Sequence, residues 1–236
     1  MEIHSCTDLL EAAREGHDEC VERLIVAGTD LNVVNAYGQT PLHIAAGMGQ
    51  DTLCKTLIEA GADAIVVNVD GNTPLHQAVY MGQNPVCKTL VAAGGDPNIA
   101  NNHGWTPLHS AAILNCSNAT IRALIAAGGD PDIADNRGRT PLQLAVEKSN
   151  KECVKVMIEC ILTKRALEDD EWGLVPTDFD IGHLLPAVMT RDGRDAAAKL
   201  VSRLPEEKRK VLKTATMCLS RLVSRDVAEQ ILVRCV

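Results

Sequence analysis

Aromatic side chains are scarce in this chain of 236 residues, which has two tryptophans, two tyrosines and one phenylalanine. Large rings supply much of the apolar area of a compact enzyme core, so their scarcity favours thin layers packed with Ala, Leu, Ile and Val. No apolar run approaches the ~18 residues of a membrane-spanning helix. The first residues lack the basic and then apolar pattern of a signal peptide. We therefore expect a cytoplasmic protein, with the nucleus as the alternative compartment, and no membrane partner.

Clusters of basic residues are missing from the first two thirds of the chain. Residues 1–164 contain 19 acidic and 11 basic side chains and carry the whole net charge of −8, whereas residues 165–236 contain 12 of each. Nucleic-acid binding needs clustered Lys and Arg opposite the phosphates. The sequence therefore predicts no nucleic-acid partner.

Motifs for catalysis or cofactor binding are also absent from the sequence. There is no Gly-x-Gly-x-x-Gly or Walker-type phosphate loop, and no His-x-x-x-His or Cys-x-x-Cys spacing for a metal. No serine or cysteine nucleophile with a positioned base is recognisable. We predict that the protein is not an enzyme and has no catalytic residues, no bound metal and no cofactor.

A repeated tetrapeptide is the main positive signal. Thr-Pro-Leu-His begins at residues 40, 73 and 106, and Thr-Pro-Leu-Gln begins at residue 140, so the interval is 33, 33 and 34 residues. Self-similarity at such a period indicates an array in which each unit buries its apolar face against the next. With the alanine pair that follows it, as at Ala45 and Ala46, this motif resembles that of the ankyrin-repeat family. The resemblance implies an all-α repeat solenoid of helix-turn-helix units with β-hairpin or loop fingers.

The local signals of one unit agree with this fold. Gly38 stands where a finger tip needs a positive φ, and Thr40 is suited to cap a helix whose first residue is proline. A second helix is predicted over 51–59, and Gly61 is predicted to end it in a left-handed conformation. In the fifth unit Ile161 replaces this glycine, so we expect its second helix to run on toward Lys164.

The period also divides the chain. The first unit lacks the proline and the histidine, and its outer acidic residues suit an N-terminal cap. A weak match after residue 182 predicts a further unit followed by helical segments, although a separate helical domain is the alternative. The predicted ranges are a capping repeat at 1–34, repeats at 35–67, 68–100, 101–134 and 135–164, an acidic insertion or linker at 165–178, and a degenerate repeat with a helical C-terminal cap at 179–236.

Several residues that suggest chemistry recur at the repeat interval and are assigned to the scaffold. His43, His76 and His109 do so, and the resemblance implies that each braces adjacent turns through hydrogen bonds with the threonine. Cys54 and Cys87 occupy a position that holds Val or Ile in other units, as small buried hydrophobes do. We expect free thiols. The resemblance permits hydroxylation of Asn32 and Asn98 without establishing it.

Side chains that the repeat leaves free are the candidates for partner binding. Superposing the units gives four sets of equivalent positions that we expect to face solvent, two on the fingers and two at the end of the first helix. The sets are Tyr37, Asp70, His103 and Arg137; Gln39, Asn72, Trp105 and Arg139; Gly47, Tyr80, Ile113 and Glu147; and Met48, Met81, Leu114 and Lys148. Aromatic and Arg side chains are typical of binding hot spots.

We predict a partner-binding site that is formed by Tyr37, Met48, Asp70, Tyr80, Met81, His103, Trp105, Leu114, Arg137 and Arg139. The alternative for Tyr37 and Trp105 is that they merely cover the stack of fingers. The leading hypothesis is a monomeric, non-catalytic module that binds a segment of another protein on its concave face. A second hypothesis is an adaptor whose repeats select a client and whose segment 179–236 recruits machinery such as a ubiquitin ligase. An enzyme or nucleotide binder is the third.

Overall fold

The computed structural model describes residues 8–114, 117–164 and 174, and it describes side chains of the last helix only as far as Ile161. The chain forms two compact units, Met1–Val156 and Met157–Val236, and the described residues lie almost entirely in the first. Apart from residue 174, the predicted insertion at 165–178 and the predicted repeat and cap at 179–236 lie outside the described residues.

The described residues contain ten α-helices in five successive pairs and no β-strand. We call the first helix of each pair inner and the second outer, and we number the repeats one to five by these pairs. The inner helices are α1 (Leu9–Glu15), α3 (Pro41–Met48), α5 (Pro74–Tyr80), α7 (Pro107–Ile113) and α9 (Pro141–Glu147). The outer helices are α2 (Asp18–Val26), α4 (Asp51–Glu59), α6 (Asn84–Ala92), α8 (Asn118–Ala126) and α10 (Lys151–Lys164).

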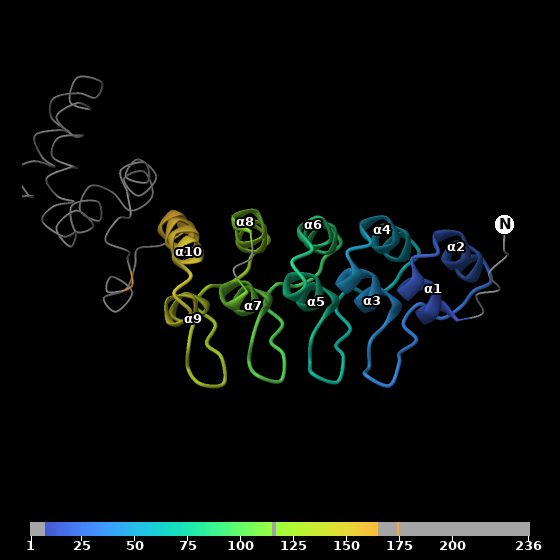
Figure 1. Ribbon diagram of the computed structural model, residues 1–236, viewed down its shortest axis with the longest axis horizontal. Coiled ribbons are helices and arrows are strands. Elements are labelled where there is room, and N and C mark those ends of the chain that lie inside the picture. The colour runs from blue at the N-terminus through green and yellow to red at the C-terminus, as the bar shows by residue number, and fades with distance from the viewer. Residues whose placement is uncertain (1–7, 115–116, 165–173, 175–236) are drawn as a thin grey trace, which may run out of the picture. The chain divides into compact units, whose positions relative to one another are not determined.

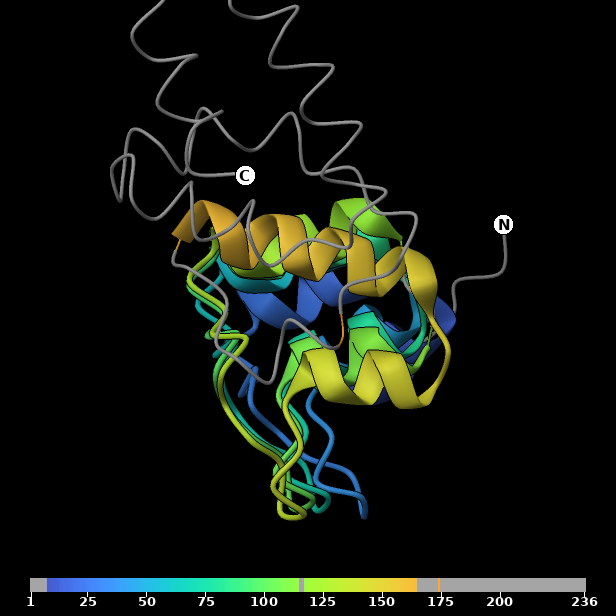
Figure 2. The ribbon, with the colours of Figure 1, turned by 90° about the vertical axis from the view of Figure 1, so that its left-hand side faces the viewer.

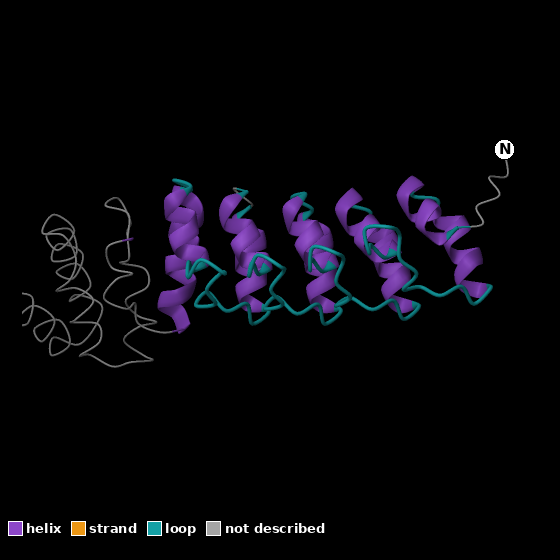
Figure 3. Cartoon of the chain, turned by 90° about the horizontal axis from the view of Figure 1, so that it is seen from below, coloured by secondary structure: helices purple, strands orange, loops and turns teal. Residues whose placement is uncertain are grey.

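The helix pairs stack in chain order. Each inner helix contacts the next inner helix, and α1, α3, α5 and α7 contact the outer helix of their own repeat. The inner helices form one row, α2, α4, α6 and α8 form a second, and loop fingers extend from the inner row (Figure 1). Seen from the finger side, the helices of successive repeats lie side by side (Figure 3). This arrangement confirms the all-α repeat solenoid.

Threonine and proline start the inner helices of repeats two to five as predicted. In repeat two, Thr40 Oγ1 accepts a hydrogen bond from the His43 backbone N–H at 3.3 Å, and His43 Nδ1 accepts one from the Thr40 N–H at 3.2 Å. This reciprocal capping box satisfies two donors that the helix itself leaves unpaired. Helix α1 begins differently, because the Asp8 side chain accepts from the Leu10 N–H at 2.9 Å.

Glycine ends the second helix of repeat two. Helix α4 ends at Glu59, Ala60 caps it, and Gly61 comes next with a φ of 99°. This left-handed conformation costs glycine little. Its N–H donates to the carbonyl of Ile58 at 2.9 Å. In repeat five, where Ile161 takes the place of this glycine, α10 continues to Lys164 as predicted. No helix within the described ranges is long and apolar enough to cross a membrane.

Leucine and alanine form a thin core between neighbouring repeats. The fully buried leucines include Leu42, Leu57, Leu75, Leu90, Leu108, Leu124 and Leu142, which lie on inner and outer helices alike. Ala45 and Ala46 are fully buried as well, and such small side chains let adjacent helices pack closely. Burying one leucine contributes roughly 2 kcal/mol. Because these contacts join one repeat to the next, the repeats stabilise each other.

Buried histidines link each repeat to the finger of the following one. The Nε2 atoms of His43, His76 and His109 lie 2.9, 2.8 and 3.1 Å from the carbonyl oxygens of Asn72, Trp105 and Arg139. Nδ1 accepts from the threonine N–H, so Nε2 carries the proton and donates to the carbonyl. The family resemblance predicted the bond to threonine. The bond to the next finger is a further finding of the structure.

Candidate partner-binding face

Each finger is a tight turn that one side-chain oxygen holds. In repeat three, Asn68 Oδ1 accepts from the backbone N–H groups of Asp70 at 3.0 Å and Asn72 at 2.9 Å. Gly71 closes the turn with a φ of 77°, and its N–H donates to the Asn68 carbonyl at 2.9 Å. Asn35, Asn101 and Asp135 accept in the same way in the other fingers. These described fingers are therefore loops and contain no paired strands.

Backbone hydrogen bonds join neighbouring fingers. The N–H of Val69 donates to the Tyr37 carbonyl at 3.1 Å, that of Asn102 to the Asp70 carbonyl at 3.0 Å, and that of Asn136 to the His103 carbonyl at 3.2 Å. The fingers consequently follow one another in register, and viewed along the stack those of repeats three to five nearly overlap while the blue finger of repeat two lies beside them (Figure 2). Their tips present a fixed row of exposed side chains, which we call the finger-tip row: Tyr37, Asp70, His103 and Arg137.

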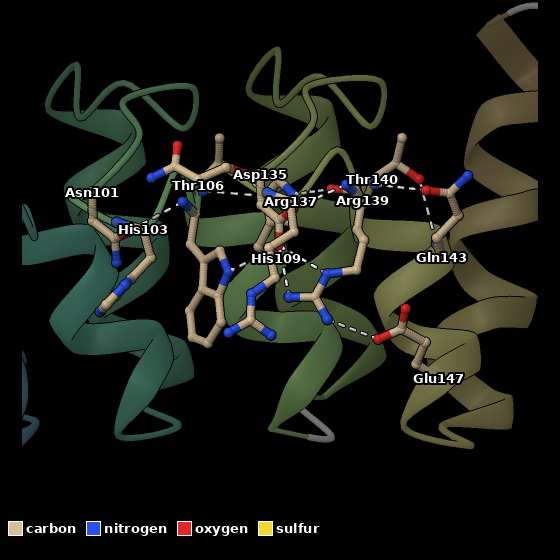
Figure 4. A network of polar contacts seen from close by, with 12 residues as sticks. Asn101, His103, Thr106, His109, Asp135, Arg137, Arg139, Thr140, Gln143 and Glu147 are labelled. Atoms are coloured by element: carbon tan, nitrogen blue, oxygen red, sulfur yellow. Dashed lines mark hydrogen bonds and ion pairs between the residues drawn. The ribbon is translucent and has the colours of Figure 1, made fainter.

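The fingers and the ends of the inner helices share one face. In repeat five, Arg139 on the finger forms an ion pair with Glu147 in the last turn of α9, with Nη1 and Oε2 2.8 Å apart (Figure 4). Because the repeats are equivalent, the corresponding positions of repeats two to four lie on this face too. We call the apolar residues at its helix ends, Met48, Tyr80, Met81 and Leu114, the helix-end row. The two rows together form the inner face.

Large apolar side chains are exposed along the inner face. The exposed fraction is 68% for Tyr37, 60% for Tyr80, 58% for Met48 and 51% for Met81, and it falls to 37% for Leu114. Neighbouring exposed apolar side chains favour contact with another molecule. Methionine adapts its shape to different partners. This part of the predicted site is therefore well placed to bind an apolar segment.

The stacked helix pairs, the capped inner helices and the linked fingers agree with a comparison to known families. Residues 9–101 and 86–166 each match a family model described as ankyrin repeats in three copies. Together these ranges span more than half of the chain. This chain belongs to the ankyrin-repeat family. No curated protein matches it. Ankyrin repeats generally mediate protein–protein interaction and are typically non-catalytic.

The ankyrin finger of repeat five differs from the others because Asp135 replaces asparagine. Asp135 Oδ1 accepts from the backbone N–H groups of Arg137 and Arg139. Its Oδ2 accepts from Arg139 Nη2 at 2.7 Å, Arg139 Nε at 3.0 Å and the Trp105 indole N–H at 3.3 Å. Figure 4 shows Arg139 between Asp135 and Glu147. The indole bond thus ties repeat four to repeat five.

Hydrogen bonding stabilises the charge of Asp135 despite its burial. Burial alone would raise the pKa of this carboxyl, but the hydrogen bonds from the Arg139 side chain and from two backbone N–H groups outweigh it and hold the pKa well below its usual range. Trp105 and Arg139 are only partly exposed. Two of the predicted site residues therefore have a structural role, whereas the guanidinium of Arg137 has no partner among the described residues.

The expected exposure is wrong for Gly47 and only partly right for five other positions, which are half-buried: Gln39, Asn72, Trp105, Ile113 and Arg139. Gly47 was expected to face solvent, but it is buried, and a Cβ atom added there would lie 3.0 Å from Gln77 Cγ of the next repeat. The side chain of Gln77 therefore covers this position. Superposition of repeats could not show that Gly47 is covered, because the covering side chain differs between repeats. Gln77 of repeat three is replaced by the smaller Ser110 in repeat four.

Three exposed apolar side chains around the junction of repeats two and three were not among the predicted site residues: Ile65, Val67 and Val69. Val69 precedes Asp70 at the finger tip and is 59% exposed. Its equivalents Asn102 and Asn136 donate side-chain N–H groups to the carbonyls of Val69 and Asn102, both at 2.9 Å. A valine among equivalent asparagines was therefore a usable signal. Val69 adds exposed apolar surface to the finger of repeat three.

Burial shifts the pKa of several titratable side chains of the scaffold. Burial lowers the pKa of His76 to about 4, and it lowers the pKa of His43 and His109 as well. Burial raises the pKa of the Cys54 thiol to about 12, with a smaller contribution from Asp51. A thiol in this state is a poor nucleophile at neutral pH. Within the described ranges, no group of three His, Cys, Asp or Glu residues could hold a metal ion.

Asn32 and Asn98 have a structural role of their own. Asn32 Oδ1 accepts from the backbone N–H of Asp63 at 3.0 Å, and Asn98 Oδ1 accepts from that of Asp130 at 2.8 Å. Asn98 Nδ2 also donates to the Gly128 carbonyl at 3.0 Å. Each asparagine therefore joins its repeat to a later one, which explains why asparagine recurs at this position.

Proposed function

We propose that the protein binds a segment of a partner protein on the inner face, over repeats two to four. The exposed helix-end row is the observation that carries this proposal. Tyr80 and Met81 lie at its centre and are both more than half exposed. Side chains of this size contribute binding free energy when a partner removes them from water. The rigid fingers add to the affinity, because little conformational entropy is lost on binding.

The protein acts by binding and has no catalytic role of its own. The buried histidines and Cys54 serve the scaffold, and general membership of the ankyrin family is consistent with an interaction module. The adaptor alternative depends on residues 179–236, which lie outside the described residues. The observations on the inner face support the binding module, and the adaptor role stays a hypothesis.

A capture experiment with a matched control tests the proposal. The full chain, a Tyr80→Ala/Met81→Ala variant and a Val26→Ala variant are immobilised, and proteins retained from cell lysate are quantified by mass spectrometry. Val26 is 88% exposed at the end of outer helix α2, so its loss removes an exposed apolar side chain from a different face.

We expect the amount of each specific partner that the double variant retains to fall at least about tenfold. This corresponds to a hot-spot contribution above roughly 1.4 kcal/mol. The Val26→Ala variant should retain them. Equal retention by all three proteins would show that the inner face is not the binding site. Trp105 is left unchanged in this test, because its bond to Asp135 would mix a loss of binding with a loss of stability.

A further inference from the structure

Charge is distributed unequally along the inner face. Between residues 24 and 121, Lys55 and Lys88 are the only lysines or arginines, and both lie on outer helices. The finger-tip row therefore contains one carboxylate, that of Asp70 in repeat three. Its only permanent cation is Arg137 in repeat five. Tyr37 and His103 occupy the other two tips.

The two charged tips have no partner within the described part of the chain. Within the described residues, Asp70 and Arg137 form hydrogen bonds only through their backbone groups: the Asp70 and Arg137 N–H groups donate to Asn68 and Asp135, and the Asp70 carbonyl accepts from Asn102. Both side chains are exposed. The neighbouring Arg139 is different, because Asp135 and Glu147 neutralise it. Asp70 and Arg137 are thus the charged side chains of the finger-tip row that remain available to a ligand, and the exposed Lys148 at the end of α9 adds a second cation at repeat five.

The backbone of the fingers fixes the separation of these charges. Each finger is hydrogen-bonded to the next, and Asp70 and Arg137 are two repeats apart. With ~10 Å between adjacent helices, the separation is on the order of 20 Å. That length corresponds to about six residues of an extended peptide or about thirteen residues of a helix. The helix-end row runs alongside, with Tyr80 and Met81 in repeat three and Leu114 in repeat four.

We infer that the partner segment has a definite charge polarity: a basic side chain opposite Asp70, apolar side chains over the helix-end row, and an acidic side chain opposite Arg137. This inference rests on the proposed function and specifies its ligand. Opposite charges at both ends fix the register and direction of the segment, and an inverted segment places like charges together. The apolar centre supplies affinity while the two tips select which apolar segments bind.

Selection from a peptide library tests the polarity. Random 16-residue peptides displayed on phage are selected against the full chain and against Arg137→Glu, Asp70→Lys, Lys88→Glu and Tyr80→Ala/Met81→Ala variants. Lys88 is exposed on outer helix α6, so Lys88→Glu matches the change in net charge of Arg137→Glu at a different face.

We expect the unchanged protein to enrich peptides with an acidic and a basic residue about six or about thirteen positions apart and apolar residues between them. Arg137→Glu should remove the preference for the acidic residue, Asp70→Lys should remove that for the basic one, and Lys88→Glu should change neither. In a double-mutant cycle with one selected peptide, replacing its acidic residue by alanine should weaken binding about threefold to fivefold. The same replacement should have little effect on an Arg137→Ala variant.

The outcomes separate the two proposals. Enrichment that depends on Tyr80 and Met81 but shows no charge preference would overturn the polarity and leave the binding function intact. A charge preference that Lys88→Glu alters as strongly as Arg137→Glu would also overturn it, because net charge would then be the cause. If the Tyr80→Ala/Met81→Ala variant enriched the same peptides as the unchanged protein, both proposals would fail.

Discussion

The two ends of the inner face differ in how far the fold already satisfies their side chains. At repeats two and three, Met48, Tyr80 and Met81 are more than half exposed. At repeat five, Asp135 binds Arg139, which in turn binds Glu147. A position on the inner face is therefore insufficient to identify a candidate binding residue. What distinguishes the two ends is whether each side chain has a partner within the chain.

The largest change in stability is expected from Asp135→Ala, which removes the centre of the repeat-five network. The Asp135 side chain is only 1% exposed, and its loss leaves two backbone N–H groups and the Trp105 indole without their acceptor and removes one of the two acidic partners of Arg139. We expect a loss of roughly 3 to 4 kcal/mol in the free energy of unfolding, measured by urea denaturation. Asn68→Ala, which removes only the two backbone bonds of its finger, should cost about 2 kcal/mol. Equal losses would contradict the special role of the repeat-five network.

A second prediction concerns acid sensitivity at the histidine-linked repeats. Burial, together with the neighbouring His43 and His109, lowers the pKa of His76 to about 4, although its bond to the Trp105 carbonyl opposes this. The unfolded chain therefore binds more protons than the folded chain between about pH 6.5 and pH 4. Stability is fully present above this window and falls as the pH drops through it, by about 3 kcal/mol at 1.36 kcal/mol per unit.

The chain offers its own control for this titration. Gln143 occupies the histidine position in repeat five, and its Oε1 accepts from the Thr140 N–H at 3.0 Å. His76→Gln should keep this cap, lose the bond to the next finger and cost about 1 kcal/mol at pH 7.5. Its stability should decline less steeply toward pH 4 in parallel urea titrations. An unchanged pH dependence would show that His76 is not the responsible group.

A smaller effect is expected at Ser149, which carries strain in repeat five that its glycine equivalents avoid. Ser149 has a φ of 57°, and Gly49 and Gly82 stand at the same position of repeats two and three with φ of 76° and 70°. Ser149→Gly should raise the free energy of unfolding by about 1 kcal/mol. The reverse change Gly49→Ser should lower it, since serine is strained at this positive φ and its Cβ would also displace the end of the Gln83 side chain. A destabilised Ser149→Gly variant would refute this explanation.

The smallest effect on stability is expected at the exposed end of the inner face. Tyr80→Ala/Met81→Ala removes side chains that are mostly in water, so the free energy of unfolding should change by no more than about 0.5 kcal/mol. Thermal denaturation of the variant and of the unchanged protein measures this difference. A loss above about 2 kcal/mol would show that these side chains support the fold.

Sequence reasoning was most successful where one repeat contains all the interacting groups. The cap at Thr40, the helix at 51–59 and the left-handed Gly61 each depend on residues close together in the chain. It failed where a side chain meets a neighbouring repeat. The burial of Gly47 depends on Gln77, and the partial burial of Trp105 accompanies its bond to Asp135, about 30 residues away. Aspartate at an asparagine position, followed after four residues by Arg139, was the only sequence sign of that network.

The repeated Thr-Pro-Leu-His motif by itself determined the repeat period, the capped helices and the ankyrin fold. It could do so because short-range hydrogen bonds and helical periodicity depend on residues that are close together in the sequence. Only the tertiary structure decided which equivalent positions remain available to a partner. Superposed repeats look alike in sequence, but each lies against different neighbours. Whether a side chain is covered, paired or exposed depends on contacts across the repeat boundary. That is why Tyr80, Met81, Asp70 and Arg137 stand out on the inner face only after the repeats are stacked.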